Sequence, residues 1–258
     1  VTPEMAKIRP YVGGFLVRGL HVTPPVLDAI IATQEKLCEN FGHRRRTLSI
    51  GFYRAALITW PVTYGDVEPA GRAFIPLGMT EPLTPAEILK RHPKGIEYAS
   101  LLSSLPRYPL LTDAKGRILS FPPIINSADV GAVTIGDSDL LVETTGTELD
   151  PMLLVLSILA ANLEDRGAEI VPVTVQYPYD TPRGREIAVP CPFHRKLRVS
   201  EGTFSSMLGE LMPREEISRM LLRYGCASTW KSETLDSLYG GSDGKDGEPM
   251  LPGVGIDR

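Results

Sequence analysis

The chain has 258 residues, of which 43% are hydrophobic and 22% are charged, enough apolar material for one sizeable domain and a smaller appendage. Its net charge of −4 excludes a global positive field, so any contact with RNA must be local. The 24 glycines and 23 prolines predict frequent turns and short strands rather than long helical bundles.

The sequence shows no pattern typical of a disulfide framework, a metal site or a membrane helix. Cys38, Cys191 and Cys226 are far apart, odd in number and without CxxC spacing, so we expect a reducing compartment, the cytoplasm. No His, Cys and Asp cluster has ligand spacing, so we predict no metal site. No apolar run reaches the roughly 20 residues of a membrane helix, so we expect no membrane partner. The start at Val1 rather than Met suggests an excised fragment.

The first elements follow from the spacing of apolar residues. Residues 12–22 combine β-prone side chains with glycines and predict a strand with a bend. From Leu27 to Phe41 apolar residues recur at helical spacing, which predicts an amphipathic helix closed by Gly42. After a basic cluster, alternate apolar residues over 48–52 predict a half-buried strand.

The middle of the chain predicts a loop, a short helix and a hairpin. Residues 61–82 look like loop and turn. A capping box from Thr84 to Glu87, with proline at the first helical position, begins a short helix. Two apolar runs on either side of residues 113–116 predict a β-hairpin that ends at the prolines 122–123.

The remaining segments predict two more strands and three helices. LLVETTGT, residues 140–147, reads as a buried strand, and a strong helix follows over residues 150–166. Alternating residues over 171–177 predict a strand, which its proline places at an edge or a bulge. Two short helices follow Thr203 and Pro213. The Gly-, Ser- and Asp-rich end of the chain has the composition of a flexible linker.

Two motifs lie about twenty residues apart. S-F-P-P-I-I-N, residues 120–126, closes the predicted hairpin, and E-T-T-G-T, residues 143–147, lies in the predicted buried strand. In this order and spacing the sequence resembles the B3/B4 editing region of phenylalanyl-tRNA synthetase β subunits of the archaeal and eukaryotic type. The likeness covers roughly residues 8–200. One departure is Phe52-Tyr53-Arg54, where many relatives carry His-Asp after Ile-Gly.

The resemblance implies a fold and an activity. It implies an α+β fold with a mixed or antiparallel β core and flanking helices over residues 1–200. Residues 201–258 would hold the first strand and helix of an incomplete, winged-helix-like B5 module and a flexible tail. The implied activity is post-transfer editing, in which the ester of mischarged Tyr-tRNA(Phe) is hydrolysed.

Editing of this kind needs a pocket that recognises one hydroxyl. An apolar pocket rejects an added hydroxyl by only about a hundredfold, whereas a pocket with a fixed acceptor disfavours phenylalanine, which leaves that acceptor unpaired. The resemblance makes Glu143 this acceptor. Because side chains alternate along a strand, Thr145 projects from the same face.

The resemblance assigns the other site residues. Ser120 and Thr145 are the predicted catalytic residues, Leu111 forms an apolar wall, and Asn126 contacts the terminal adenosine. Each has a structural alternative: Glu143 on a solvated strand face, the serine and threonine as ordinary strand and turn residues, and the leucine in the core. No general base accompanies them, so the enzyme would position a water, assisted by the terminal ribose hydroxyl of the tRNA.

The resemblance also implies partners. Arg44, Arg45 and Arg46, with a second basic run over residues 194–198, are predicted to contact tRNA phosphates, although such runs are also typical of solvated edges. No cofactor is implied for this fragment; ATP and magnesium belong to the whole α2β2 synthetase, whose α subunit holds them. The alternative function is a non-catalytic module of the same fold that binds tRNA or helps the subunits assemble.

Overall fold

The computed structural model describes residues 1–191 and 197–230. The chain divides into two compact units, Val1–Pro192 and Phe193–Arg258. The assignment of these parts to an editing module and a B5-like module stays a prediction. None of the helices in the described ranges is long and apolar enough to cross a membrane.

The larger unit contains two antiparallel sheets. The five-stranded sheet has the order β2-β7-β1-β8-β9, and the four-stranded sheet has the order β3-β4-β5-β6. The strands are β1 (Tyr11–Arg18), β2 (Leu48–Arg54), β3 (Thr63–Val67), β4 (Tyr108–Thr112), β5 (Ile118–Phe121), β6 (Ile125–Asn126), β7 (Leu140–Gly146), β8 (Glu169–Gln176) and β9 (Glu186–Val189). The α-helices of this unit are α1 (Pro24–Asn40), α2 (Pro85–Arg91), α3 (Pro93–Tyr98) and α4 (Leu149–Glu164). Three short 3-10 helices are Pro3–Lys7, Ala55–Leu57 and Ala99–Leu101.

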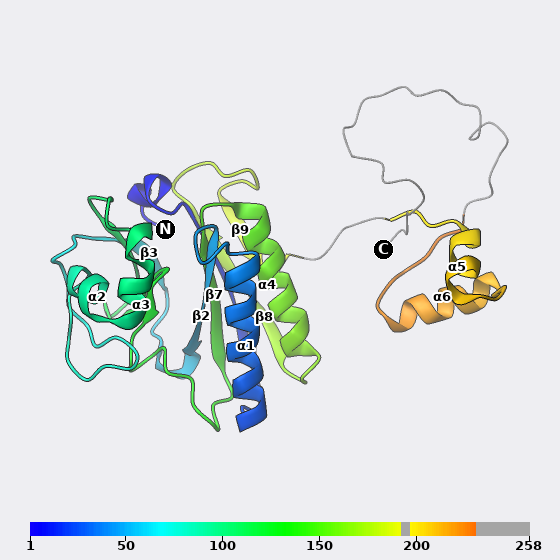
Figure 1. Ribbon diagram of the computed structural model, residues 1–258, viewed down its shortest axis with the longest axis horizontal. Coiled ribbons are helices and arrows are strands. Elements are labelled where there is room, and N and C mark those ends of the chain that lie inside the picture. The colour runs from blue at the N-terminus through cyan, green and yellow to red at the C-terminus, as the bar shows by residue number, and fades with distance from the viewer. Residues whose placement is uncertain (192–196, 231–258) are drawn as a thin grey trace. The chain divides into compact units, whose positions relative to one another are not determined.

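Four layers make up this unit, as Figure 1 shows. The helices α1 and α4 cover one face of the five-stranded sheet, and α2 and α3 lie beyond the four-stranded sheet. One apolar cluster, which includes Phe15 and Leu156, fills the space between the helices and the five-stranded sheet. Another, which includes Tyr64 and Leu141, lies between the two sheets. Because the five-stranded sheet is covered on both faces, every residue of β7 is buried.

Most predicted elements are confirmed, and the exceptions are instructive. The loop predicted over 61–82 contains β3, which was missed because it is short and its partner β4 is far away in the chain. The strand predicted to be half-buried, β2, is buried at six of its seven residues. The strand with Pro172 is not an edge strand. Pro172 is the last residue that pairs with β1, and pairing with β9 begins only at Val173.

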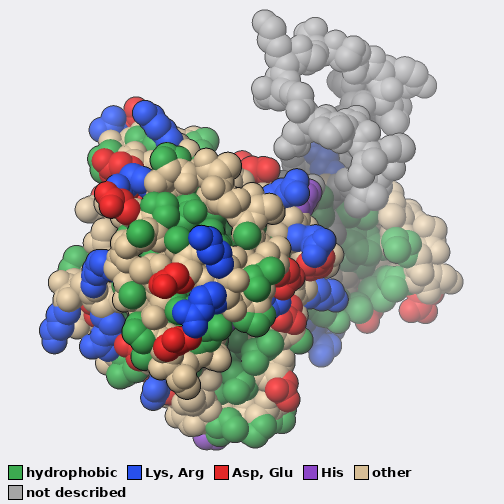
Figure 2. Space-filling view, turned by 60° about the vertical axis from the view of Figure 1, so that its left-hand side comes forward, with side chains coloured by type: hydrophobic (Ala, Val, Ile, Leu, Met, Phe, Trp, Pro, Cys, Tyr) green, Lys and Arg blue, Asp and Glu red, His purple; other side chains and the backbone are tan. Residues whose placement is uncertain are grey.

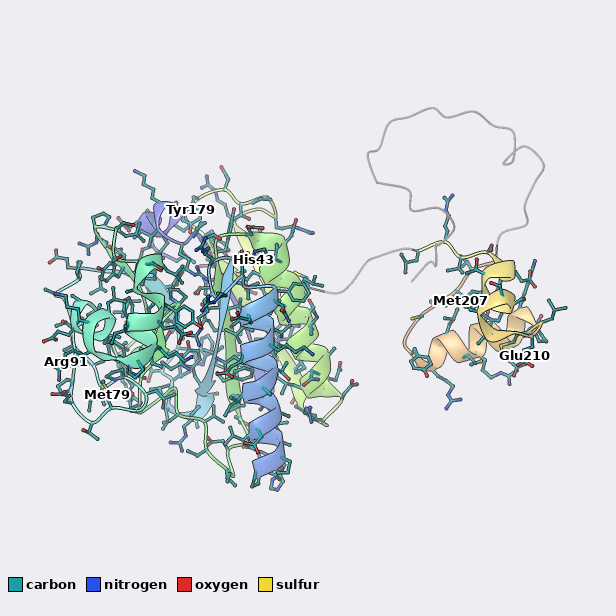
Figure 3. All side chains as sticks on the ribbon, in the orientation of Figure 1. His43, Met79, Arg91, Tyr179, Met207 and Glu210 are labelled. Carbon is teal, nitrogen blue, oxygen red and sulfur yellow. The ribbon has the colours of Figure 1, made fainter. Side chains whose placement is uncertain are left out.

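The turn after α1 also differs from the prediction. Gly42 does not adopt the left-handed conformation; instead His43, Arg44 and Arg45 have φ angles of 46°, 58° and 63°. Figure 3 labels His43 at this end of the helix. Gly42 is needed for another reason, since a β carbon there would lie 2.3 Å from the carbonyl oxygen of Cys38. Three successive non-glycine residues with positive φ are strained, so surrounding contacts must hold this loop.

The described part of the smaller unit contains two helices, α5 (Glu201–Leu208) and α6 (Arg214–Arg223). The prediction of two short helices is therefore confirmed. The strand that the resemblance implied within residues 200–226 is absent, because this stretch forms helices and the turns between them. The end of the chain, predicted to be a linker, lies outside the described residues.

Candidate functional site

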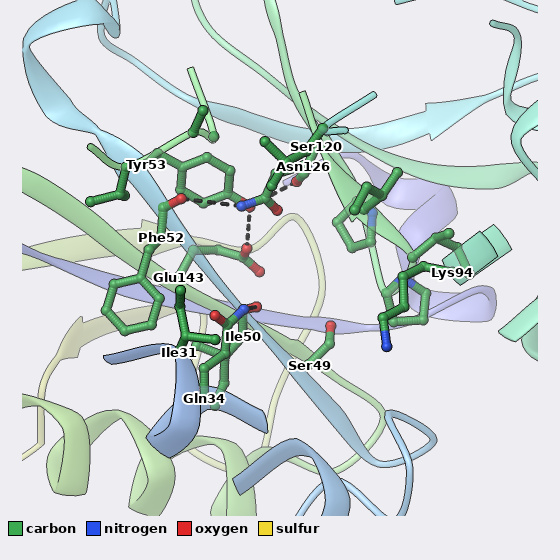
Figure 4. Close-up of a pocket in the computed structure, with 18 of the residues that line it drawn as sticks. Ile31, Gln34, Ser49, Ile50, Phe52, Tyr53, Lys94, Ser120, Asn126 and Glu143 are labelled. Atoms are coloured by element: carbon green, nitrogen blue, oxygen red, sulfur yellow. Dashed lines mark hydrogen bonds between the residues drawn. The ribbon is translucent and has the colours of Figure 1, made fainter. Parts of the chain in front are cut away.

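A pocket of about 270 Å³ opens at the edge of the five-stranded sheet, where β2 is the outer strand. Helix α1 and the loop that follows it contribute one side, and the segment from β5 to β6 contributes the other (Figure 4). Its polar lining residues include Gln34, Arg45, Tyr53, Ser120, Asn126 and Glu143. The volume is slightly below the range of roughly 300–1,000 Å³ that is typical of small-molecule sites.

Strand pairing places Glu143 between two glycines. Glu143 of β7 pairs with Gly51 of β2 on one side and with Gly14 of β1 on the other. A β carbon at Gly51 would lie 2.7 Å from Glu143 Oε2, so the carboxylate uses the space that the missing side chain leaves. The Glu143 side chain is buried, with only 4% of the residue exposed, although it borders the pocket.

A hydrogen-bonded cluster surrounds the carboxylate. The hydroxyl oxygen of Tyr53 lies 2.7 Å from Glu143 Oε2 and 2.8 Å from Ser120 Oγ (Figure 4). Glu143 Oε1 is buried and has no hydrogen-bond partner among the described residues. Burial raises the pKa of Glu143 to about 7, although the hydrogen bond from Tyr53 and the positive charge of Arg9 lower it. The carboxylate therefore titrates near neutral pH and keeps one acceptor oxygen unused.

Arg9 holds the strained loop against β7. Its Nε donates to Thr145 Oγ1 at 3.2 Å and its Nη2 donates to the Thr145 carbonyl at 2.9 Å. Its Nη1 donates to the carbonyl of Arg46 at 3.0 Å, and its Nη2 also donates to that of Arg45 at 3.3 Å. Burial lowers the pKa of Arg9. These four bonds satisfy a buried cation with neutral acceptors and fix where the loop lies.

Arg45 joins this loop to the opposite side of the pocket. Its Nη1 donates to the carbonyl oxygens of Pro123 at 3.0 Å and Ile124 at 2.8 Å. Its guanidinium also lies 4.6 Å from the centre of the Tyr98 ring. The contacts tie the end of α1 to the segment between β5 and β6, so Arg45 forms part of the pocket wall.

Known proteins similar to this chain share one description. No protein-family model matches the sequence. The chain is 43% identical over 239 residues to the phenylalanine–tRNA ligase β subunit of Borrelia hermsii, covering 93% of this chain and 42% of that protein. It is 42% identical over 234 residues to the phenylalanine–tRNA ligase β subunit of Treponema pallidum, covering 91% of this chain and 39% of that protein. A solved N-terminal fragment of the phenylalanyl-tRNA synthetase β subunit from Pyrococcus horikoshii matches with a TM-score of 0.79 and 33% identity, over 89% of this chain and 64% of that chain.

The chain is a homologue of the phenylalanine–tRNA ligase β subunit. It spans about two fifths of the length of the curated β subunits that it matches. The predicted family resemblance and the α+β fold are confirmed, and the predicted mixed or antiparallel core is antiparallel throughout the described sheets.

The structure of this β-subunit homologue brings four of the predicted site residues together, one of which is Arg45. Ser120, Asn126 and Glu143 all line the pocket. Asn126 Nδ2 donates to the carbonyl of Phe52 at 3.1 Å, which fixes β6 against β2. The alternative of a solvated face does not apply to Glu143, because that residue is buried. The roles assigned to these residues stay predictions.

Two other predicted residues lie behind the pocket surface. Thr145 is fully buried, and its Oγ1 lies 3.0 Å from Oγ of Ser49, which does line the pocket. Leu111 belongs to the apolar cluster between the sheets and pairs with Ser120 across two neighbouring strands. Any effect of Thr145 or Leu111 on a ligand in this pocket would therefore act through Ser49 or Ser120.

The predicted tRNA-binding arginines are in different environments. Arg45 is partly buried in the pocket wall, whereas Arg44 and Arg46 are exposed. Acidic and basic side chains are interspersed on the face shown in Figure 2. The second basic run falls mostly on residues 192–196, which lie outside the described ranges. Within the described ranges no group of three or more His, Cys, Asp or Glu side chains could hold a metal ion.

The polar lining residues Gln34, Ser49, Tyr53 and Lys94 were not predicted, and neither was Arg9 behind them. Gln34 had a signal in the sequence, since it continues the apolar stripe of Leu27, Ile30 and Ile31 at helical spacing, and its Nε2 donates to the Ile50 carbonyl at 2.7 Å. Tyr53 was noticed only as a departure from the family pattern. Arg9 had no local signal, because its partners are 36 to 136 residues away in the chain.

Proposed function

We propose that this chain is the post-transfer editing part of a phenylalanine–tRNA ligase β subunit and hydrolyses the ester of Tyr-tRNA(Phe). The observation that carries the proposal is that Glu143 lines the pocket and that its buried Oε1 has no partner among the described residues. Leaving a buried acceptor unpaired costs roughly 1–3 kcal/mol, and more when it is charged. The phenol of a tyrosyl group would donate to this oxygen, whereas a phenylalanyl group would leave it unpaired.

The reaction is an ester hydrolysis. A water adds to the ester carbonyl carbon, the bond from that carbon to the ribose oxygen breaks, and the ribose oxygen receives a proton. The products are free tyrosine and tRNA(Phe). Ser120, which lines the pocket, accepts a hydrogen bond from this water in the proposed reaction, and the neighbouring ribose hydroxyl of the tRNA assists. Holding water and ester together supplies most of the rate in this proposal.

The proposal places the chain in a larger assembly. In the whole synthetase an α subunit would bind ATP and magnesium, and no step proposed for this chain uses either. The exposed Arg44 and Arg46 would contact tRNA phosphates, while Arg45 shapes the pocket. Asn126 would contact the terminal adenosine from the β6 side of the pocket.

A direct assay tests the proposal. The chain is incubated with Tyr-tRNA(Phe) and, separately, with Phe-tRNA(Phe), and release of the amino acid is followed over time. We expect faster release of tyrosine than of phenylalanine, and loss of this preference in Glu143→Ala. Thr145→Ala should slow release through Ser49. Binding of Tyr-tRNA(Phe) without release, in the intact synthetase as well, would favour the non-catalytic module of the same fold.

A further inference from the structure

The hydroxyl of Tyr53 has two hydrogen-bond neighbours but only one proton to donate. It lies 2.7 Å from Glu143 Oε2 and 2.8 Å from Ser120 Oγ. An ionised carboxylate can only accept, so Tyr53 must give its proton to Glu143. The Tyr53 hydroxyl is also placed to donate to Ser120 Oγ, so when its proton serves Glu143 the 2.8 Å contact is satisfied only by the serine's own proton. The three side chains thus form a chain of hydrogen bonds with one direction, from Ser120 through Tyr53 to Glu143.

This direction determines what the pocket offers to a ligand. The protons of Ser120 and Tyr53 are both used within the chain of hydrogen bonds. Two residues that line the pocket then keep free acceptors, the buried and unpaired Oε1 of Glu143 and the lone pairs of Ser120 Oγ. The cluster therefore presents acceptors to the pocket and no donor.

We propose that Tyr53 is a positioning residue that determines specificity. Its phenol orients Glu143 and Ser120 as hydrogen-bond acceptors, so the pocket binds ligands that carry a hydrogen-bond donor in preference to ligands that lack one. This inference rests on the proposed function and deepens it. One oxygen of Glu143 is occupied by a phenol of the protein itself, and the other is left for the phenol of the ligand. Donors at the para position of the aromatic ring are accepted, whether hydroxyl or amino, and a para methoxy group is rejected.

The backbone of β2 is built to hold this phenol. Tyr53 is fully buried, and its side chain lies on the same face of β2 as Gly51, two residues earlier. A β carbon at Gly51 would lie only 2.2 Å from the Tyr53 hydroxyl oxygen. Gly51 pairs with Glu143 in the neighbouring strand, so one bare position leaves room for both the phenol and the carboxylate.

Protonation of Glu143 would reverse the chain of hydrogen bonds. A neutral carboxyl group can donate to Tyr53, which then donates to Ser120, whose proton becomes free to point into the pocket. Burial raises the pKa of Glu143, whereas Tyr53, through its hydrogen bond, and Arg9, through its charge, lower it. Burial and the charge of Glu143 both raise the pKa of Tyr64 and Cys38. Because the hydrogen bond from Tyr53 lowers the pKa of Glu143, its loss should move the acid limb of ligand binding to higher pH.

The test compares two buried tyrosines. Tyr53→Phe removes the hydroxyl of the cluster, and Tyr64→Phe is the matched control, because Tyr64 is equally buried, donates to the Arg9 carbonyl at 3.1 Å and does not line the pocket. Binding of the amides of tyrosine, 4-aminophenylalanine, O-methyltyrosine and phenylalanine is measured by calorimetry between pH 5 and pH 9. Thermal unfolding of each variant checks that it is folded.

The wild type and Tyr64→Phe should bind the two donor ligands at least about tenfold more tightly than the other two. Tyr53→Phe should lose most of this preference, and its remaining binding should weaken at a higher pH than in the wild type. If Tyr53→Phe keeps the wild-type preference and pH profile, the inference is wrong while the proposed function stands. If the wild type shows no preference for tyrosine amide, the proposed function itself fails.

A second variant keeps the inference testable if Tyr53→Phe does not fold. Gly51→Ala retains both hydroxyls, but its β carbon would lie 2.2 Å from the Tyr53 hydroxyl and 2.7 Å from Glu143 Oε2, so it breaks the hydrogen bond between them. We expect the same loss of preference for donor ligands, and an unchanged preference would contradict the role of Tyr53.

Discussion

The two faces of strand β7 differ in chemistry, one being apolar and the other polar. Leu140 and Val142 point toward α1 and α4 and belong to the large apolar cluster there. Glu143 and Thr145 point the other way, into a network with Arg9, Tyr53 and the serines of β2 and β5. One strand thus supports a stable core with one face and a polar, partly unsatisfied site with the other. The first face should determine folding and the second ligand recognition.

Truncation of the apolar face should have the largest effect on stability. Leu156 of α4 is fully buried in the cluster against the five-stranded sheet. Leu156→Ala should lower the free energy of unfolding by about 2–5 kcal/mol, because it removes buried methyl groups and leaves a cavity. Denaturant unfolding measures this loss. The preference for tyrosyl over phenylalanyl ligands should stay unchanged in the folded variant; a lost preference would mean that the two faces are not independent.

Removal of the Glu143 charge on the polar face should raise the free energy of unfolding instead of lowering it. The pKa of Glu143 is raised from 4.5 to about 7, so the folded state binds this proton more tightly than the unfolded chain does. Stability contributed by this group is therefore lost as pH rises from about 4.5 to 7. Glu143→Gln should be more stable than the wild type at pH 8, by at most about 3 kcal/mol, and equal to it at pH 4. It should also lose the tyrosine preference.

Thermal unfolding of both proteins at the two pH values measures this difference. A Glu143→Gln variant that is less stable than the wild type at pH 8 would show that the ionised carboxylate strengthens the fold, which contradicts the raised pKa of Glu143.

Thr144 offers a smaller test on the apolar side of the same strand. Its side chain alternates with that of Glu143, is fully buried, and has a hydroxyl with no partner among the described residues. Thr144→Val keeps the shape and removes a polar atom, so it should stabilise the protein by about 1 kcal/mol. The matched change Thr145→Val removes a hydroxyl bonded to Arg9 and Ser49, so it should destabilise. Chemical denaturation of the pair decides whether this contrast holds.

The exposed arginines should affect stability least and RNA binding most. Replacing Arg44 and Arg46 by alanine should change the free energy of unfolding by no more than about 0.5 kcal/mol. The slope of log K for tRNA(Phe) against log salt concentration should fall by about 1 for each arginine that binds a phosphate in the wild type. Filter binding at several salt concentrations measures it. Arg45→Ala differs from these changes, because it should weaken binding of tyrosine amide in the pocket. An unchanged salt slope in the variant that lacks both Arg44 and Arg46 would exclude these two arginines from the tRNA interface.

Local spacing predicted most of the fold of this chain. The helices α1 and α4 and the strands β2 and β7 follow from periodicity that a window of ten to twenty residues contains. The strand β3 does not, because its five residues, Thr63–Val67, acquire their structure by pairing with β4. The burial of β2 could not be predicted from local spacing either, because it depends on the four-stranded sheet that packs over the five-stranded sheet.

The site was predictable only as far as its motifs extend. Ser120, Asn126 and Glu143 lie in two recognisable segments, and the structure puts them around one pocket. Tyr53 and Arg9 reach that site through strand register and through contacts across more than thirty residues of chain. The absence of Thr145 from the pocket surface also depends on register, because Ser49 of the neighbouring strand lies in front of it.

The central claim concerns one atom, Oε1 of Glu143, and a crystal structure of the chain with tyrosine amide bound at pH 8 tests it most directly. We expect the phenol oxygen of the ligand about 2.5–3.0 Å from Oε1, with Tyr53 still bonded to Oε2. A ligand whose phenol lies elsewhere, or a pocket filled with the aromatic ring pointing away from Glu143, would contradict the account.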